Sequence, residues 1–546
     1  MKYWLVGLLA IVLFIPFLGS VHLFDWDEVN FAECSREMLL TGDYLRPHID
    51  FQAFWEKPPL FFWMQALAMK VFGVNEFASR FPNAICGIVT LVFLFSAGKK
   101  LFGEQFGFLW VLAYAGSFFP NMYFKTGIID PWFNLFIFLS LYYFILYHWK
   151  RNAFDLESLK LNAVSYAILS GVFMGLALLL KGQVAFVVFC LALGVYFVYN
   201  RFKLFFNFGH VLIYLVVAFA VTLTWYGYVT FKYGTWFVRE FFIYQIRLFS
   251  THDAGHEGFF AYHYVVILLG CFPASVLAIP SFFKNKTLTR YEKDFKIWML
   301  ILFWVVTILF SFVGTKIIHY SSLAWFPVTF LGAYTIHNLI ENRVFWKKYV
   351  TIVVGTIGYL VATLFTIFPF FAMHIKKFIP YVADVFAQGN MEADVHWSGF
   401  ESLIGIGLFV LVFLGLKWFK EGKTQQAAYS LFCGTGLTIF LAAAVIAPKV
   451  ERYTQGAMID FFEERIGEDC YVQVLDFKSY AHLFYTQKTK PTNINYYNTD
   501  WLLNGKIDKP VYFVSKIDRP EAYEGKPQLK ELYRKNGFVF FKREKP

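Results

Sequence analysis

Long apolar runs recur along the whole chain, and they constrain its fold more than any other feature of the sequence. Runs of about 18 or more apolar residues are long enough to cross the hydrocarbon layer of a membrane as helices. A soluble protein of 546 residues would need a well-charged surface, but only 16% of this chain is charged and 58% is apolar. A transmembrane barrel would show short alternating segments instead. The sequence therefore predicts an α-helical integral membrane protein.

The apolar runs predict thirteen candidate spans. They cover residues 3–20, 80–98, 106–122, 131–147, 163–180, 183–199, 209–227, 262–282, 297–313, 322–340, 349–371, 401–418 and 427–447. The first run follows only two residues and could pass for a signal peptide. Because it lacks a small-residue cleavage site, it is interpreted as a retained span.

Basic residues predict how these spans are oriented. With a cytoplasmic N-terminus, each of the six inner loops holds at least two Lys or Arg, and the short outer connections hold one Lys each. Cytoplasmic loops are enriched in Lys and Arg, so this arrangement fits the observed charges. The same rule explains the net charge of +11 without nucleic acid as a partner. Segments 21–79, 228–261 and 372–400 are then predicted to lie outside, with the tail from residue 449.

Two domains follow from this organisation. Residues 1–448 form the predicted transmembrane domain, whose first outer loop covers about 21–79, and 449–546 form a soluble α/β domain. Within the loop, 61–72 is apolar but too short to span, so it is expected to lie along the interface. In the tail, 471–475, 511–514 and 538–541 predict strands, while 480–486 and 527–535 predict helices. Cys34 and Cys470 both lie outside, and the sequence leaves open whether they pair.

Ionisable residues beside a membrane are costly unless they are used, and here they gather at the outer ends of the spans. The first cluster is Asp25-Trp26-Asp27-Glu28, directly after the first span. A carboxylate in this position suits a general base that takes a proton from a hydroxyl. The alternative is that the cluster caps the next helix. The spacing does not decide between the two.

Two further clusters contain prolines. Glu56 and Lys57 precede Pro58-Pro59, which hold the backbone extended, and a lysine there is suited to phosphate. Asp130 precedes Pro131 at the outer end of a span. A surface ion pair is the alternative for the first cluster, and a helix cap for the second.

The remaining clusters fall in later outer loops. Lys181 lies between two apolar runs and must either reach the interface or meet an anion. The other two clusters are the loop with Arg247, His252, Asp253, His256 and Glu257, and the turn with Thr315, Lys316, His319 and Tyr320. The loop lacks the spacing of a zinc-binding HExxH helix, and the turn could simply anchor the interface. Convergence of all six clusters on one face favours a site for an anionic lipid head group.

These motifs, in order, resemble the bacterial GT-C glycosyltransferases, in the branch of the lipid A aminoarabinose transferases and the protein O-mannosyltransferases. The motifs that carry the resemblance are Asp27 to Glu33, Arg36 to Leu39, Thr41 to Tyr44, Glu56 to Pro59, Asp130-Pro131, Lys181-Gly182, Gly255 to Gly258 with Tyr262 and Tyr264, and Thr315 to Tyr320. The resemblance covers the whole chain. The chain departs from the lipid A branch at Asn30, where that branch usually has Arg.

The resemblance implies an inverting transfer from a polyprenyl-phosphate sugar in the inner membrane of a bacterium, with the site on the periplasmic side. It makes Asp27 the catalytic carboxylate, supported by Glu28 and Asp130, and assigns the lipid phosphate to Lys57 and Arg247. Glu56, Lys181, Lys316, His319 and Tyr320 complete the expected substrate site. Glu56 with His252 or His256 matches the place where some members bind a divalent metal such as zinc. Others need none, so metal dependence stays open.

The implied partners are the polyprenyl-phosphate sugar, membrane lipids and an acceptor that is a lipid, a glycan or a protein. The oligomeric state stays open, and a monomer is consistent with the sequence. A transporter or flippase of lipid-linked glycans is the main alternative function. Transporters place ionisable residues near the bilayer midplane and often show inverted repeats. Here the charges lie at span ends on one side, which favours the enzyme.

Overall fold

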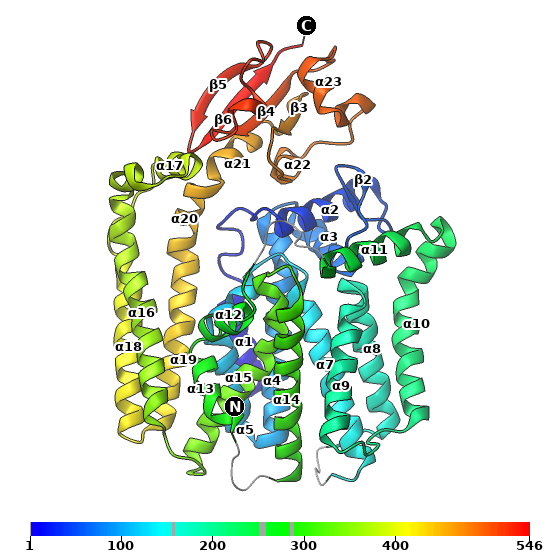
Figure 1. The fold of residues 1–546 in the computed structure, drawn as a ribbon, viewed down its shortest axis with the longest axis vertical. Helices are drawn as coiled ribbons and strands as arrows, with labels where there is room; N and C mark the ends of the chain where they lie inside the picture. Colours follow the sequence, from blue (N-terminus) through cyan, green and yellow to red (C-terminus); the bar gives the residue numbers. More distant parts are fainter. Residues whose placement is uncertain (1, 155–158, 251–257, 284–288, 546) are drawn as a thin grey trace.

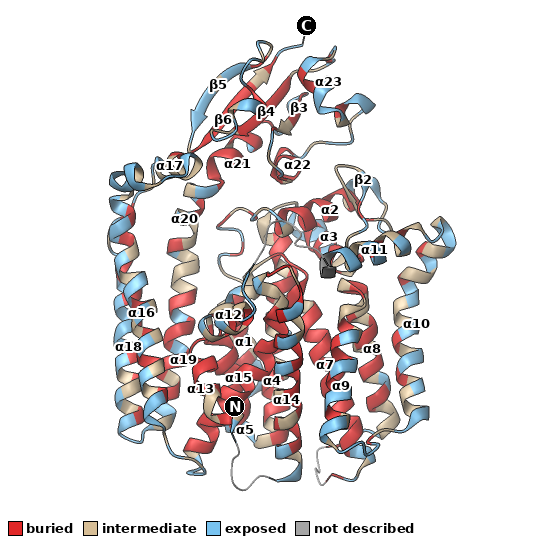
Figure 2. Ribbon diagram, viewed as in Figure 1, coloured by how far each residue is buried: buried red, intermediate tan, exposed pale blue. Residues whose placement is uncertain are grey.

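The computed structural model describes residues 2–154, 159–250, 258–283 and 289–545. A bundle of long helices is covered at one end by a small sheet domain that holds the C-terminus (Figure 1). Large apolar side chains remain exposed on the outer faces of several long helices, as expected for surfaces in contact with lipid; Leu360 and Phe413 are examples, at 56% and 54% exposed. Figure 2 shows these exposed faces most clearly on α10, α16 and α18.

Eight described helices are long and apolar enough to cross a membrane. They are α4 (Glu76–Phe102), α7 (Asp130–Arg151), α8 (Ala163–Lys181), α10 (Phe208–Tyr233), α14 (Arg290–Phe312), α16 (Lys348–Met373), α18 (Ser402–Lys420) and the continuous helix Thr424–Thr454, which combines α19 (Thr424–Leu441), η6 (Ala442–Ile446) and α20 (Ala447–Thr454). A ninth span is a broken one. It joins α12 (Tyr262–Gly270) to α13 (Ala274–Ala278) and η3 (Ile279–Phe282), with a bend of 106°.

The other four predicted spans contain shorter helices. These are α1 (Tyr3–Phe14), α5 (Glu104–Ala115), α9 (Val184–Tyr199) and α15 (Trp325–Ile340). Short connecting helices accompany them: α6 (Phe118–Met122), η1 (Tyr123–Lys125), α11 (Trp236–Ser250), η4 (Ile318–Ala324), η5 (Ile375–Tyr381) and α17 (Val385–Met391). Every predicted span therefore contains helix. The count of thirteen crossings stays a prediction, because these four helices are shorter than an ordinary span.

Small residues allow the helices of the bundle to approach closely. Gly98 of α4 faces Gly107 of α5, and a Cβ added to Gly98 would lie 2.6 Å from the Gly107 Cα. Such contacts are typical of packing between membrane helices, where van der Waals fit replaces the hydrophobic effect. Helix α15 is buried along nearly its whole length, so it forms the centre of the bundle.

The first outer loop forms a layer between the bundle and the C-terminal domain (Figure 1). It consists of α2 (Asp27–Thr41), the two-residue strands β1 (His48–Ile49) and β2 (Gln52–Ala53), and α3 (Leu60–Phe72). The predicted helix at 61–72 is present as α3. Helix α2 is buried from Glu28 to Met38 although it carries several charges. Glu33 and Arg36 pair with each other within α2, at 2.6 Å, and Glu28 pairs with Arg80 of α4.

The C-terminal domain holds a four-stranded sheet in the order β3-β4-β6-β5. Strand β3 (Tyr471–Val474) is parallel to β4 (Val511–Lys516), and β6 (Phe538–Arg543) pairs antiparallel with both β4 and β5 (Lys530–Lys535). Its helices are α21 (Gly456–Glu463), α22 (Ala481–Thr486), η7 (Ile494–Tyr497), α23 (Thr499–Asn504) and η8 (Pro520–Ala522). Three predicted strands and the helix at 480–486 are therefore confirmed. The last long helix runs to Thr454, beyond the boundary predicted at 448.

One prediction in this domain is wrong. Residues 527–535 were expected to be helical, but 530–535 form the edge strand β5. The Asn536-Gly537 pair explains the difference, because both residues have positive φ, 50° and 82°, as a tight hairpin turn requires. The turn pairs β5 with β6, and the charged side chains of β5 suit a solvent-exposed edge.

All six cysteines are free thiols, so Cys34 and Cys470 do not pair. The Sγ atom of Cys34 lies 3.6 Å from Oδ1 of Asn30, one turn earlier in α2. Cys470 directly precedes β3. Both are buried.

Candidate active site

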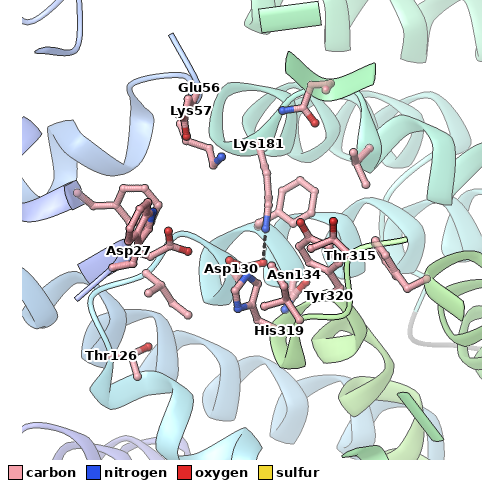
Figure 3. A pocket seen from close by; sticks show the side chains of 18 of the residues that line it. Asp27, Glu56, Lys57, Thr126, Asp130, Asn134, Lys181, Thr315, His319 and Tyr320 are labelled. Carbon is pink, nitrogen blue, oxygen red and sulfur yellow. Dashed lines mark hydrogen bonds and ion pairs between the residues drawn. The ribbon is translucent and has the colours of Figure 1, made fainter. Parts of the chain in front are cut away.

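A cavity of about 780 Å³ lies where the first outer loop meets the bundle. All of the predicted catalytic and substrate-binding residues except Lys316 line it (Figure 3). The charged and polar residues in its wall are Asp25, Asp27, Glu28, Glu56, Lys57, Thr126, Asp130, Asn134, Lys181, Tyr244, Gln245, Arg247, Thr315, His319, Tyr320 and Lys478. Clusters that are far apart in the sequence therefore converge on one space.

Asp27 is the first residue of α2, and its carboxylate faces the cavity (Figure 3). A carboxylate in the first helical turn is stabilised by the partial positive charge of the helix N-terminus. Lys57 and His319 are close enough to feel its charge. Asp27 is only partly buried, so it combines a fixed backbone with access to the cavity.

Glu28, the next residue, has a different environment. Its carboxylate pairs with Arg80 of α4, at 2.8 Å from Nη2 and 3.1 Å from Nε, and accepts hydrogen bonds from the backbone N–H groups of Phe24 and Gly127. Burial alone would raise the pKa of Glu28, but Arg80 and these hydrogen bonds outweigh it and lower the pKa. Glu28 thus fixes the start of α2 against the bundle beside Asp27.

Two cations in the cavity wall share one aromatic ring. The Lys57 Nζ atom lies 5.1 Å from the ring centroid of Tyr244, and the Arg247 guanidinium carbon lies 5.2 Å from it. The chain bends at Glu56 and Lys57 instead of being extended as predicted, and Pro58-Pro59 follow just before α3 begins. Tyr244 and Arg247 lie on neighbouring turns of α11. Desolvation lowers the pKa of Lys57, with the charges of Glu56 and Asp27 opposing this shift. Burial, and then the charge of Glu56, raise the pKa of Tyr244.

The cavity floor contains a buried ion pair. Lys181, the last residue of α8, places Nζ 2.6 Å from Oδ1 of Asp130, the first residue of α7 (Figure 3). The same ammonium lies 5.4 Å from the ring centroid of Tyr320. Asp130 therefore begins α7 and also pairs with a cation of the cavity. The two predicted roles, at a helix start and in the site, are compatible.

The short helix η4 supplies the wall opposite Asp27. His319 and Tyr320 both point into the cavity (Figure 3). Asn134, one turn after Asp130, donates a hydrogen bond of 2.7 Å to Oγ of Ser322 and so ties η4 to α7. Desolvation lowers the pKa of His319, which keeps its imidazole neutral near pH 7.

Lys316 differs from the prediction, because it lies outside this cavity. Its ammonium donates to the carbonyl oxygens of Phe310, Ser311 and Val313 at 3.2, 2.7 and 2.7 Å. A lysine has three donors, and all three are used to cap the end of α14. This arrangement favours a structural role for Lys316 over contact with a substrate.

The predicted metal set is only partly described. Glu56 lines the cavity, whereas His252 and His256 lie in 251–257, outside the described residues. Among described residues, His22, Glu76 and Glu463 bring ligand-type atoms within 4.8 Å of one another, but they lie away from this cavity. His22 also pairs with Glu451 at 2.9 Å, which explains the group as an ion-pair cluster.

Several residues of the site were not predicted. Asn134 lies four residues after Asp130, and Tyr244 three residues before Arg247, so helical spacing could have found both. Arg80 lies at the start of a predicted span, where an arginine is costly unless it is paired. Its position therefore indicated a buried acidic partner. Lys478 comes from the C-terminal domain, and no local pattern connects it to this cavity.

Comparisons with known proteins agree with this architecture. Residues 56–226 match the family described as dolichyl-phosphate-mannose-protein mannosyltransferase. An undecaprenyl phosphate-alpha-4-amino-4-deoxy-L-arabinose arabinosyl transferase of Shewanella sediminis is 24% identical and covers 97% of this chain and 91% of its own. The transferase of the same name from Photorhabdus laumondii is 25% identical over 50% of this chain and 48% of its own, so that match spans about half of each protein.

The fold also matches a solved structure along its whole length. The crystal structure of ArnT from Cupriavidus metallidurans bound to undecaprenyl phosphate has a TM-score of 0.74 and 16% identity, and the match covers 99% of this chain and 97% of that one. Because the sequence relatives are named transferases and the fold agrees with them, the transporter alternative is not favoured. Sequence and fold together confirm the predicted resemblance: the chain is an integral membrane glycosyltransferase with a GT-C-type fold, similar to the bacterial aminoarabinose transferases and the protein mannosyltransferases.

Proposed function

We propose that this enzyme transfers a sugar from an undecaprenyl or related polyprenyl phosphate, with inversion, to an acceptor on the periplasmic face of the bacterial inner membrane. The acceptor classes are lipid A, another glycolipid or a protein. The observation that carries the proposal is the placement of Asp27 across one cavity from Lys57, Lys181 and Arg247. A base and a group of cations are the two requirements for activating a hydroxyl beside a phosphate leaving group.

Asp27 acts as the base. Its carboxylate takes the proton of the acceptor hydroxyl while that oxygen forms a bond to the anomeric carbon of the sugar. The bond between the anomeric carbon and the phosphate oxygen breaks, and its electron pair leaves with the polyprenyl phosphate. Attack from the face opposite the leaving group inverts the anomeric centre.

Lys57 and Arg247 hold the phosphate. Both cations lie against Tyr244, so they approach a shared position from neighbouring elements. The negative charge on the phosphate increases as it leaves, and fixed cations stabilise that charge without reorganising. Asp130 keeps Lys181 in place beside them.

The remaining cavity wall suits the lipid part of the donor. Its apolar members include six side chains from α7, α9, α14 and η4: Phe133, Ile137, Val184, Val188, Phe310 and Leu323. A cavity with both charged and apolar walls suits a polyprenyl phosphate, which has a charged head and an apolar chain. Zinc at Glu56 with His252 or His256 stays a prediction.

The test is transfer by the purified chain in liposomes. Undecaprenyl-phosphate-linked sugars are supplied as donors, and the mass increase of lipid and protein acceptors is measured. D27N is expected to fold normally and to lose at least about 100-fold in rate, as for removal of a general base. Full activity in D27N would exclude Asp27 as the base, and transfer of no sugar by the unaltered enzyme would contradict the proposed function.

A further inference from the structure

The C-terminal domain contributes directly to the cavity. Among the described residues that line it, Lys478 is the only one beyond residue 448. Lys478 lies in the segment between β3 and α22, more than 400 residues from Asp27 in sequence. The domain is therefore part of the site and not only a cover placed above the membrane.

Contacts between two loops hold this segment in position. The backbone N–H of Tyr480 donates a hydrogen bond of 3.3 Å to Oδ1 of Asp25. The rings of Trp26 and Tyr480 pack edge to face, with centroids 5.7 Å apart. The Lys478 ammonium lies 4.2 Å from the centroid of the Trp26 ring. Lys478 is thus fixed next to the residue that precedes Asp27.

The charge of Lys478 is available to a substrate. Its described contacts are with the rings of Trp26 and Tyr480, and it forms no ion pair with a described carboxylate. Lys181, in contrast, is held in an ion pair with Asp130. The Lys478 side chain is also exposed, so an anion reaching the cavity from the side of the C-terminal domain meets its ammonium.

We propose that Lys478 is a specificity-determining residue that binds an anionic group of the acceptor, a phosphate or a carboxylate. This inference rests on the proposed function. The acceptor hydroxyl must reach Asp27, and Lys478 sits against the adjacent Trp26, whereas the cations assigned to the donor phosphate gather around Tyr244. The C-terminal domain thereby selects acceptors that carry negative charge near the reacting hydroxyl.

The test compares K478M, which removes the charge at similar length, with K478R, which keeps it. The matched control is K516M, because Lys516 is a lysine of the same domain whose ammonium lies over Phe386 and Phe477 and which does not line the cavity. Initial rates are measured over a grid of donor and acceptor concentrations. The acceptor is the one identified in the liposome assay, and undecaprenyl phosphate is the competitor of the donor.

K478M is expected to raise the KM for the acceptor about tenfold, the effect of losing one charge-assisted hydrogen bond, with kcat and the donor KM nearly unchanged. K478R should restore most of the affinity, and K516M should match the unaltered enzyme. An unchanged acceptor KM in K478M would overturn the assignment. So would a raised donor KM with weaker inhibition by undecaprenyl phosphate, because Lys478 would then serve the donor. Both outcomes require an active enzyme, so they are distinct from a failure of the proposed function.

Discussion

Lys181 and Asp130 join the end of α8 to the start of α7 through a contact of 2.6 Å between Nζ and Oδ1. The side chains are 17% and 6% exposed, so each charge depends on the other for compensation. Breaking a buried pair by removing one partner leaves an uncompensated charge, whereas removing both does not. Comparing single and double variants therefore separates the contribution of the pair to stability from its contribution to transfer.

The variants D130N, K181M and D130N/K181M use this difference. Each single variant is expected to lose about 3–5 kcal/mol of stability, and the double variant should regain a large part of it. Thermal unfolding in detergent measures the stability. Transfer by the double variant should stay low, since a cation beside the phosphate is gone. Normal transfer by the double variant would show that the pair only supports the fold.

Adjacent carboxylates in α2 are expected to respond differently to neutralisation. E28Q weakens the pairing of Arg80 and is expected to destabilise the fold by about 3–5 kcal/mol. D27N, its matched control one residue away, should unfold at the normal temperature and lose transfer. Unfolding temperature and transfer rate are compared for both variants. A normal melting temperature for E28Q would remove Glu28 as the anchor of α2.

Lys57 is predicted to bind the donor phosphate. K57M is expected to weaken inhibition by free undecaprenyl phosphate about tenfold, because one charge-assisted contact is lost. Competition is measured as the concentration that halves transfer. K125M, which removes another outer lysine that does not line the cavity, is the control. Unchanged inhibition of K57M would remove Lys57 from the phosphate site.

The interface between α2 and the C-terminal domain is predicted to depend on pH. Burial and then the charge of Glu33 raise the pKa of Asp50 to about 7, and burial with Glu33 also raises the pKa of Glu37. Tyr497 donates a hydrogen bond of 3.1 Å to the backbone oxygen of Asp50, and Arg36 donates one of 3.0 Å to Lys488 O. These contacts join the first outer loop to the C-terminal domain.

A raised carboxyl pKa means that the protonated form is favoured in the folded state. The protonated Asp50 carboxyl therefore contributes to the stability of the folded state. This contribution is complete below about pH 4, the ordinary carboxyl range, and is lost as the pH rises through about 7. Hydrogen exchange of 480–500 is therefore expected to be faster at pH 8.5 than at pH 5.5, after correction for intrinsic exchange. D50N should reduce this difference, and equal protection at both pH values in the unaltered protein would contradict the prediction.

The orientation can be tested with two introduced cysteines. Ile494 of the C-terminal domain is 77% exposed, and Phe345, in a predicted inner loop, is 85% exposed. An impermeant maleimide added to intact cells, with the outer membrane permeabilised, is expected to label I494C and not F345C. F345C should react only after the inner membrane is opened, which controls for its reactivity. Labelling of F345C alone in intact cells would place the site on the cytoplasmic side.

The sequence alone determined the features that depend on local composition. Hydropathy located a helix in every predicted span, because an apolar run of sufficient length has one stable form in a bilayer. The short motifs from Asp27 to Tyr320 identified many of the charged residues that line one cavity, but they also included Lys316, which does not line it. Short strand-like stretches identified β3, β4 and β6, but the same reading missed β5, whose sign was the turn at Asn536-Gly537.

Only the tertiary structure decided which charges meet. Glu28 and Asp27 are adjacent in sequence, yet one is buried against Arg80 and the other faces the cavity. Lys316 and Lys181 both stand in short outer turns, yet one caps α14 and the other pairs with Asp130. Lys478 enters the cavity from the other end of the chain. The role of a charge depends on the partner that replaces its water, and that partner is set by packing between distant segments.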